Sequence, residues 1–317
     1  MNSPRNAAAL PAILLLLAAN LLWAGQGVAI KRLAVGLPPV AVALLPLYCT
    51  TVIGLVLIFL RGGAAQKFGR AWRLRREFCL AGICGQLTAQ VGMTLGVNWS
   101  TASNGAILSL LIPIFGALIA VRLLRERLTG LRIGALLLGF AGVLLLSPLQ
   151  RLSGREIHIR EVAGNLLIAI GCLGSAFYNV YSKRLLQHFS GLETLFFSYL
   201  STTIFSLPIL FATEPHCLDS LRHLELPQWV AFTYLVIFLY GLSMVFFLKA
   251  LDTVDAVVAS TSLYLTPIFG LLFAFMLLGE RLTPLALGGA AIVLLATLML
   301  FRFDYSFQFQ PVSSRDC

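Results

Sequence analysis

The chain has 317 residues, of which 59% are hydrophobic and 11% are charged, whereas about 45–50% and 25% are usual in soluble domains. A water-soluble protein of this length cannot bury that much apolar surface in one core, so lipid must solvate most of the chain. The net charge of +10 does not indicate a nucleic-acid-binding protein, because the Lys and Arg residues lie at the ends of apolar runs and between them.

Hydrophobic runs of about 20 residues, the length that crosses a bilayer as a helix, follow one another along the chain. They cover residues 9–30, 38–60, 78–97, 102–122, 130–148, 162–182, 192–212, 228–248, 256–278 and 284–302. Membrane-spanning β-strands would alternate polar and apolar residues, but these runs are apolar on every face. The sequence therefore predicts an all-α integral membrane protein with ten transmembrane helices, joined by short loops and without a soluble domain.

The positive charges predict the orientation of these helices. With the N-terminus inside, 16 of the 23 Lys and Arg residues fall on inner segments, and six of them lie between Arg61 and Arg76. Cytoplasmic loops carry such an excess, so we expect both termini in the cytoplasm and the protein in the cell (inner or plasma) membrane. The six residues also suit anionic headgroups, although orientation alone explains them. Lys31-Arg32 after the first run favours a retained span over a cleaved signal peptide.

Two phrases occur twice at one offset. Pro113-Ile114-Phe115-Gly116 returns 154 residues later as Pro267-Ile268-Phe269-Gly270, and each copy is followed by Glu-Arg-Leu-Thr, at Glu126 and at Glu280. Such a fixed period indicates an internal duplication, with repeats at 9–148 and 162–302. Because each repeat has five spans, the second must enter the membrane from the opposite side. The prediction is two inverted five-helix repeats around a substrate site near mid-membrane, a plan that recurs in transporters.

The repeated phrase also predicts hinges. A proline within a span removes a helix hydrogen bond and kinks the helix, and a following glycine lets another helix approach closely. The hinge candidates are Pro113, Gly116, Pro267 and Gly270. A role in packing and turn formation alone is the alternative.

These motifs resemble those of the drug/metabolite transporter superfamily, in its EamA-type family with two EamA domains. The resemblance is carried by Asn20-Leu21-Leu22-Trp23-Ala24 and by the two repeated blocks, and it covers essentially the whole chain. It implies a cavity built from spans 1, 3, 4, 6, 8 and 9. The chain departs from the family where members often carry an arginine in the second span, since Leu45-Pro46-Leu47-Tyr48 stands here. A substrate contact by that arginine is therefore not expected.

Polar and aromatic side chains within apolar spans are candidates for substrate contact, because such residues face the bundle interior. They are Asn20, Trp23, Gln86, Gln90, Asn104, Tyr178, Asn179, Tyr240 and Tyr264. The alternative for each is a hydrogen bond between helices, or space filling for the rings.

The expected function is secondary transport, with export or exchange of a small polar metabolite such as an amino acid by alternating access. No acidic residue lies near the middle of a span, which makes proton coupling the less favoured mechanism. The alternative is a membrane-embedded enzyme or a protein that translocates lipid or sugar phosphate. However, no catalytic constellation, paired cysteines or metal-ligand cluster is visible, so we expect no enzyme, cofactor or metal. The expected partners are a small-molecule substrate and the lipid bilayer, without nucleic acid, and a homodimer stays open.

Overall fold

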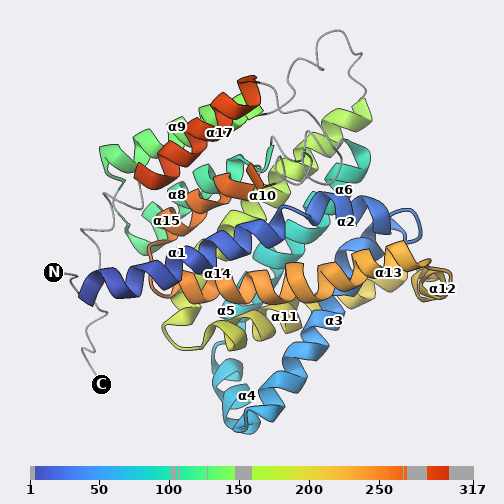
Figure 1. The fold of residues 1–317 in the computed structure, drawn as a ribbon. Helices are drawn as coiled ribbons and strands as arrows, with labels where there is room; N and C mark the ends of the chain where they lie inside the picture. The colour runs from blue at the N-terminus through green and yellow to red at the C-terminus, as the bar shows by residue number, and fades with distance from the viewer. Residues whose placement is uncertain are drawn as a thin grey trace.

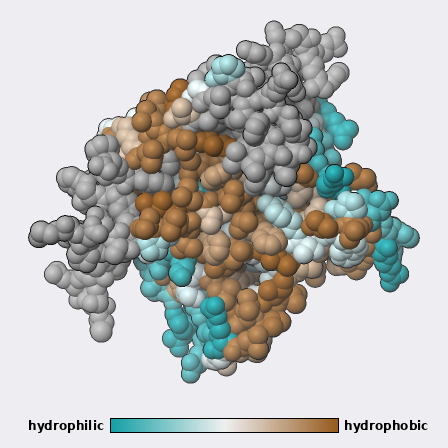
Figure 2. All heavy atoms as spheres, in the orientation of Figure 1, coloured by the Kyte–Doolittle hydropathy of each residue, from teal (hydrophilic) through white to brown (hydrophobic). Residues whose placement is uncertain are grey.

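The computed structural model describes residues 4–100, 105, 108–126, 128–146, 159–266, 268–269 and 284–299. In these ranges every regular element is helical (Figure 1). Six helical stretches are long and apolar enough to cross a membrane: Leu10–Leu33, Pro39–Leu60, Arg75–Trp99, Val162–Leu186, Gly191–Thr213 and Leu226–Leu251. Each overlaps one expected run, and a broad apolar band covers the face seen in Figure 2. The protein is thus a multi-pass membrane protein.

Shorter helices overlap the other four expected runs. They are α8 (Leu111–Leu124), α9 (Gly130–Leu146), α15 (Ala256–Thr261) with the 3-10 turn η4 (Ser262–Tyr264), and α17 (Pro284–Met299). Three of the candidate residues, Asn104, Pro267 and Gly270, lie outside the described residues.

The first span is broken, although the sequence predicted one continuous helix. The helix α1 (Pro4–Trp23) ends in a turn, and α2 (Gln26–Leu33) continues from it. The Tyr234 hydroxyl donates a hydrogen bond to the Leu22 carbonyl, which lacks a helical partner at this break. A Cβ at Gly25 would lie 2.4 Å from the same hydroxyl oxygen. Glycine is therefore required for the tyrosine to reach the broken backbone.

Two other spans contain wide π-helical turns. One is α5 (Arg75–Leu80), η1 (Ala81–Leu87) and α6 (Thr88–Trp99); the other is α13 (Leu226–Thr233), η3 (Tyr234–Ser243) and α14 (Met244–Leu251). Thr202 donates to the Gly82 carbonyl in η1 at 3.0 Å, and Thr50 donates to the Val236 carbonyl in η3 at 2.8 Å. Gly82 and Val236 are 154 residues apart, and the two threonines are 152 apart. In each half, a threonine at an equivalent position therefore donates a hydrogen bond to a carbonyl of the π-helical turn.

The helices α3 (Pro39–Leu60) and α11 (Gly191–Thr213) begin 152 residues apart and pack against each other. Their contacts run in opposite directions along the two helices: the hydroxyls of Thr51 and Thr203 lie 3.3 Å apart, and those of Tyr48 and Ser206 lie 2.8 Å apart. At the end of this crossing, the Glu214 carboxylate accepts backbone hydrogen bonds from the first turn of α3. The pair is therefore antiparallel and crosses at two residues that are themselves 152 apart.

A glycine seam joins α6 to α10 (Ile159–Leu186), the most extensively packed pair of helices in the described chain. A Cβ added at Gly92 would lie 2.9 Å from the Gly171 Cα, and one added at Gly96 would lie 2.8 Å from the Gly164 carbonyl oxygen. The backbones thus touch directly, as small residues permit between membrane helices. The pair α1 and α14 packs through side chains instead, including the Trp23 and Phe247 rings at 5.3 Å.

The basic segment after α3 was expected to be a loop, and this prediction was wrong. It contains the helix α4 (Ala64–Arg73), entered through Gly62 and Gly63 at φ 70° and 66°. Phe68 anchors the helix, because its ring packs 5.8 Å from that of Phe196 and 5.2 Å from that of Phe197. The loop prediction missed this amphipathic helix because its apolar face consists of few residues.

Candidate functional site

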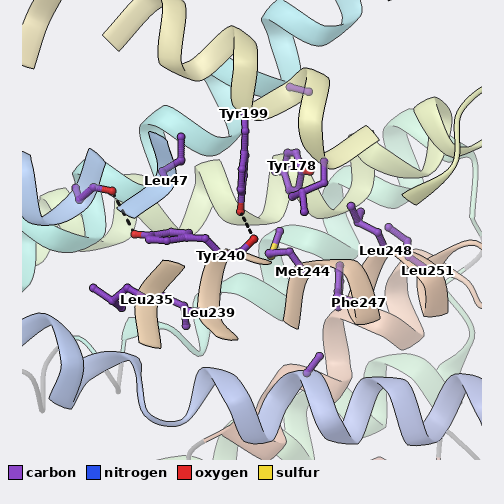
Figure 3. Close-up of a cluster of buried hydrophobic side chains, with 14 of the residues drawn as sticks. Leu47, Tyr178, Tyr199, Leu235, Leu239, Tyr240, Met244, Phe247, Leu248 and Leu251 are labelled. Carbon is purple, nitrogen blue, oxygen red and sulfur yellow. Dashed lines mark hydrogen bonds between the residues drawn. The ribbon is translucent and has the colours of Figure 1, made fainter. Parts of the chain in front are cut away.

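Three of the expected site residues form one hydrogen-bonded chain. Gln90 Nε2 donates to Gln86 Oε1 at 3.2 Å, and the Tyr240 hydroxyl donates to Gln90 Oε1 at 3.1 Å. The chain continues to Tyr199, whose hydroxyl donates to the Tyr240 carbonyl at 3.1 Å; Figure 3 shows these two rings nearly perpendicular. We call these four residues the amide–tyrosine chain. It joins η1, α6, η3 and α11, and it carries no net charge.

Within this chain, Gln86 and Tyr240 are each only 2% exposed, whereas Gln90 is partly exposed. The Tyr240 hydroxyl also lies 3.3 Å from the Ala43 carbonyl oxygen. Gln90 is therefore the member best placed to meet a solute, and the buried members fix its orientation.

Asn20 forms a separate polar node on the first span. Its Nδ2 donates to the Leu16 carbonyl at 2.7 Å and to Ser262 Oγ at 3.2 Å, and its Oδ1 accepts from Thr266 Oγ1 at 2.8 Å. The side chain is fully buried and ties α1 to the segment that contains η4. At an offset of 152 from Asn20, Cys172 Sγ lies 3.3 Å from the Leu108 carbonyl, and Leu108 is 154 residues before Ser262. Equivalent positions thus contact each other in both halves.

The other expected residues that the structure describes are Trp23, Tyr178, Asn179 and Tyr264, which lie outside these two groups. Trp23 is partly exposed beside Phe247. Tyr178 and Asn179 are nearly buried on α10, and Tyr264 is buried against Gly139. Among the described residues, the buried hydroxyl of Tyr264 has no hydrogen-bond partner.

The first copy of the repeated phrase lies at the start of α8. Pro113 cannot donate to the carbonyl of Ser109 four residues earlier, and the chain makes a turn at Ser109–Leu110 directly before the helix. Gly116 faces α15, since a Cβ there would lie 2.7 Å from Ser260 Oγ. The proline thus stands in the first turn of a new helix rather than in the middle of a continuous one.

Four charged residues, which we call the ion-pair network, meet at one end of the helices. Arg132 on α9 is completely buried, with Nη2 at 2.6 Å from Asp255 Oδ2 and Nη1 at 3.9 Å from Glu126 Oε2. Lys183 on α10 adds contacts of 3.3 Å to Asp255 Oδ1 and 3.6 Å to Glu126 Oε1, and it donates to the Val254 carbonyl at 2.6 Å.

Glu126 has a second function in this network. Its two carboxylate oxygens accept the backbone N–H groups of Ala256 and Val257 at 2.9 and 3.1 Å. A carboxylate is favoured there by the positive end of the helix dipole as well as by the two cations. One residue of the first half therefore holds the start of a span in the second half.

The ion-pair network was not predicted from the sequence. A signal was present, since all four residues lie at span ends on the side expected to be cytoplasmic. Nothing in their spacing joins them, however, because the network combines segments up to 129 residues apart.

Comparison with known proteins identifies the family. The model of the EamA-like transporter family matches residues 10–147 and again residues 162–302. The chain belongs to this family.

Similar EamA proteins are named as transporters. One is a probable terminal-alkyne amino-acid exporter of Streptantibioticus cattleyicolor, 26% identical over 290 residues, which cover 88% of this chain and 90% of the relative. Another is an S-adenosylmethionine uptake transporter of Rickettsia prowazekii, 25% identical over 215 residues and 65% of both chains. A crystal structure at a TM-score of 0.72 and 19% identity covers 91% of this chain and 95% of its own, and so shares the fold.

Proposed function

We propose that this EamA-family protein is a secondary transporter that exports or exchanges a small polar metabolite of the amino-acid class by alternating access. The observation that carries the proposal is a neutral, hydrogen-bonded polar chain buried among apolar helices of a transporter family. Amides and hydroxyls can bind the charged groups and the side chain of a zwitterion, whereas they offer no countercharge for a multiply charged phosphate. The relative named as an amino-acid exporter supports the same class.

The proposed architecture is ten spans in two inverted five-helix repeats, at 9–148 and 162–302, with both termini cytoplasmic. Three observations support it: the antiparallel crossing at Thr51 and Thr203, the matched threonine bonds to the two π-turns, and the equivalent contacts of Asn20 and Cys172. In such a pair, each half can close one side of the membrane while the other side opens.

The ion-pair network is the proposed lock of the cytoplasmic side. It joins Glu126 and Arg132 of the first repeat to Lys183 and Asp255 of the second. Opening on this side would separate these charges, so the closed state is favoured until substrate binding or release offsets the loss. The proposed hinges are the break after Trp23 and the turn before Pro113, with Gly116, Pro267 and Gly270.

The proposed substrate contacts are Gln90 and Trp23. Both are partly exposed, whereas Gln86 and Tyr240 beside Gln90, and Phe247 beside Trp23, are buried. Asn20, Gln86 and Tyr240 hold the surrounding helices, and Tyr178, Asn179, Tyr264 and Asn104 complete the proposed cavity. Transport is proposed to be facilitated or by exchange, since the carboxylates of the ion-pair network are held by cations and helix N–H groups at a span end.

The test is counterflow in proteoliposomes. Vesicles loaded with an unlabelled amino acid are diluted into the labelled one, over a panel of amino acids, with a proton ionophore present. We expect saturable accumulation for one chemical group of amino acids, at least tenfold lower for Gln90→Ala and Trp23→Ala. Gln66→Ala, an exposed glutamine on α4, is the matched control. Unchanged kinetics in both site variants would exclude the site, and accumulation that requires a proton gradient would exclude the proposed coupling.

A further inference from the structure

The basic segment around α4, from the end of α3 to the start of α5, carries cations that pair with no carboxylate of the described residues. Six Lys and Arg residues lie between Arg61 and Arg76. Three of them are engaged within the protein. Lys67 pairs with Glu193 at 3.8 Å, Arg70 hydrogen-bonds the His188 carbonyl and stacks on the Phe189 ring at 4.9 Å, and Arg75 lies over the Trp72 ring at 5.3 Å.

The other three are Arg61, Arg73 and Arg76, which we call the free arginines. All three are exposed, and no carboxylate of the described residues lies within ion-pair distance of them. The one acidic residue next to this segment, Glu77, instead accepts a hydrogen bond from the Tyr181 hydroxyl. The positive charge of this surface is therefore not compensated by neighbouring side chains.

Apolar surface adjoins the free arginines. The Trp72 side chain is 71% exposed, and at the end of α3 Phe59 and Leu60 are 60% and 77% exposed. In Figure 2, hydrophilic atoms gather at the lower end of the molecule, where Figure 1 shows α4, beside the apolar surface of α3. An exposed tryptophan beside arginines at the end of a span is the arrangement of a helix at the headgroup level.

The second half supplies an internal comparison. The surface helix α12 (Cys217–Arg222) follows α11 as α4 follows α3. There Asp219 lies 3.8 Å from both His216 and Arg222, so the charges are balanced. A requirement to lie on a membrane would apply to both helices. Of these two surface helices, only α4 is flanked by arginines that no carboxylate compensates.

We infer that the α4 surface, made of Arg61, Trp72, Arg73 and Arg76, binds the headgroups of anionic phospholipids. The guanidinium groups pair with phosphate oxygens in the two-pronged geometry that favours arginine, while Trp72 lies at the boundary between the headgroups and the acyl chains. α4 packs on the start of α11 through Phe68 and Lys67. Lipid held at α4 therefore stabilises the contact between the α3 and α11 halves of the molecule.

The experiment measures lipid retention on the purified full-length protein, independently of transport. Protein in mixtures of phosphatidylcholine and phosphatidylglycerol is analysed by native mass spectrometry, and its melting temperature is measured with each lipid alone. We expect preferential retention of phosphatidylglycerol and a higher melting temperature with it. The triple variant R61Q/R73Q/R76Q should reduce the preference for phosphatidylglycerol on the order of 100-fold. Each Lys or Arg near an anionic membrane surface raises the affinity about fivefold, and three of them are removed.

The control is K31Q/R32Q/R222Q, which removes the same charge from three exposed positions elsewhere. It should retain the wild-type preference, and both triple variants should melt like the wild type in phosphatidylcholine. Equal loss in the two variants, or no preference in the wild type, would overturn the inference. A melting-temperature rise with millimolar inorganic phosphate equal to that with phosphatidylglycerol would assign the surface to free anions, and so would also overturn it.

Discussion

Replacing Gly116 by alanine tests the contact between the repeated phrase and α15. The new Cβ would lie 2.7 Å from Ser260 Oγ and 3.0 Å from Ser260 Cβ, whereas ordinary contacts between such atoms exceed about 3.4 Å. Overpacking of this kind costs about 1–3 kcal/mol. Alanine also favours the helix over glycine by about 1 kcal/mol, so the expected net destabilisation is about 0–2 kcal/mol.

Gly134 on α9 separates these two terms. A Cβ there meets no atom within 4 Å, so Gly134→Ala gains only the helix term. The free energies of unfolding of the two variants should therefore differ by the cost of overpacking, about 1–3 kcal/mol. This difference corresponds to about 2–12 °C in melting temperature, if 1 kcal/mol shifts it by about 2–4 °C.

Thermal unfolding in detergent, followed by the fluorescence of a thiol- or tryptophan-based reporter, gives the comparison. Ser260→Gly removes both clashing atoms, so the double variant with Gly116→Ala should recover most of the loss. The reasoning would be refuted if Gly116→Ala and Gly134→Ala had the same melting temperature. It would also be refuted if Gly116→Ala destabilised the Ser260→Gly protein as much as the wild type.

Three further predictions concern other contacts. In a cysteine-free background, Tyr48→Cys with Ser206→Cys should form a disulfide under mild oxidation, which gel mobility detects. Tyr48→Cys with Leu200→Cys, the pair that a parallel crossing would bring together, should not. The reverse result would contradict the antiparallel crossing. Arg132→Gln should destabilise the fold by about 3–5 kcal/mol, because it removes the buried guanidinium that contacts both Asp255 and Glu126. Thermal unfolding equal to that of Arg160→Gln, at an exposed position, would show that the ion-pair network contributes little. Outside the spans, burial and then the Glu214 carboxylate raise the pKa of the Cys217 thiol, so its thiolate fraction at neutral pH is small; peptide mass spectrometry should find slow alkylation that accelerates only above the usual thiol range, and rapid alkylation at pH 7 would disprove this.

The membrane class and the duplication could be predicted because they depend on local amino-acid composition and on sequence motifs that occur twice. Most apolar runs overlap helices for this reason, and the family model matches the chain twice. The break after Trp23 could not be predicted in the same way. It depends on Tyr234, more than 200 residues away, whose hydroxyl satisfies the freed carbonyl.

The candidate site was predicted only in part for a similar reason. Residue type and span position identified Gln86, Gln90 and Tyr240, which form one chain. Residue type alone could not distinguish the partly exposed Gln90 from Asn20, whose hydrogen bonds are all made within the protein. The ion-pair network escaped prediction because its members belong to four separate segments, each of which has ordinary charges at a span end.

The glycine seam between α6 and α10 limits which halves of the chain can pack against each other. A Cβ at Gly171 would lie 2.7 Å from the backbone nitrogen of Met93, and the residue 152 positions before Gly171 is Ala19. Two copies of the first half would have to place that alanine in the same slot, where it does not fit. Two copies of the second half would bring Phe246, 154 positions after Gly92, into a slot shaped for glycine. Expressed apart, the two halves are therefore expected to assemble with each other rather than as two identical copies.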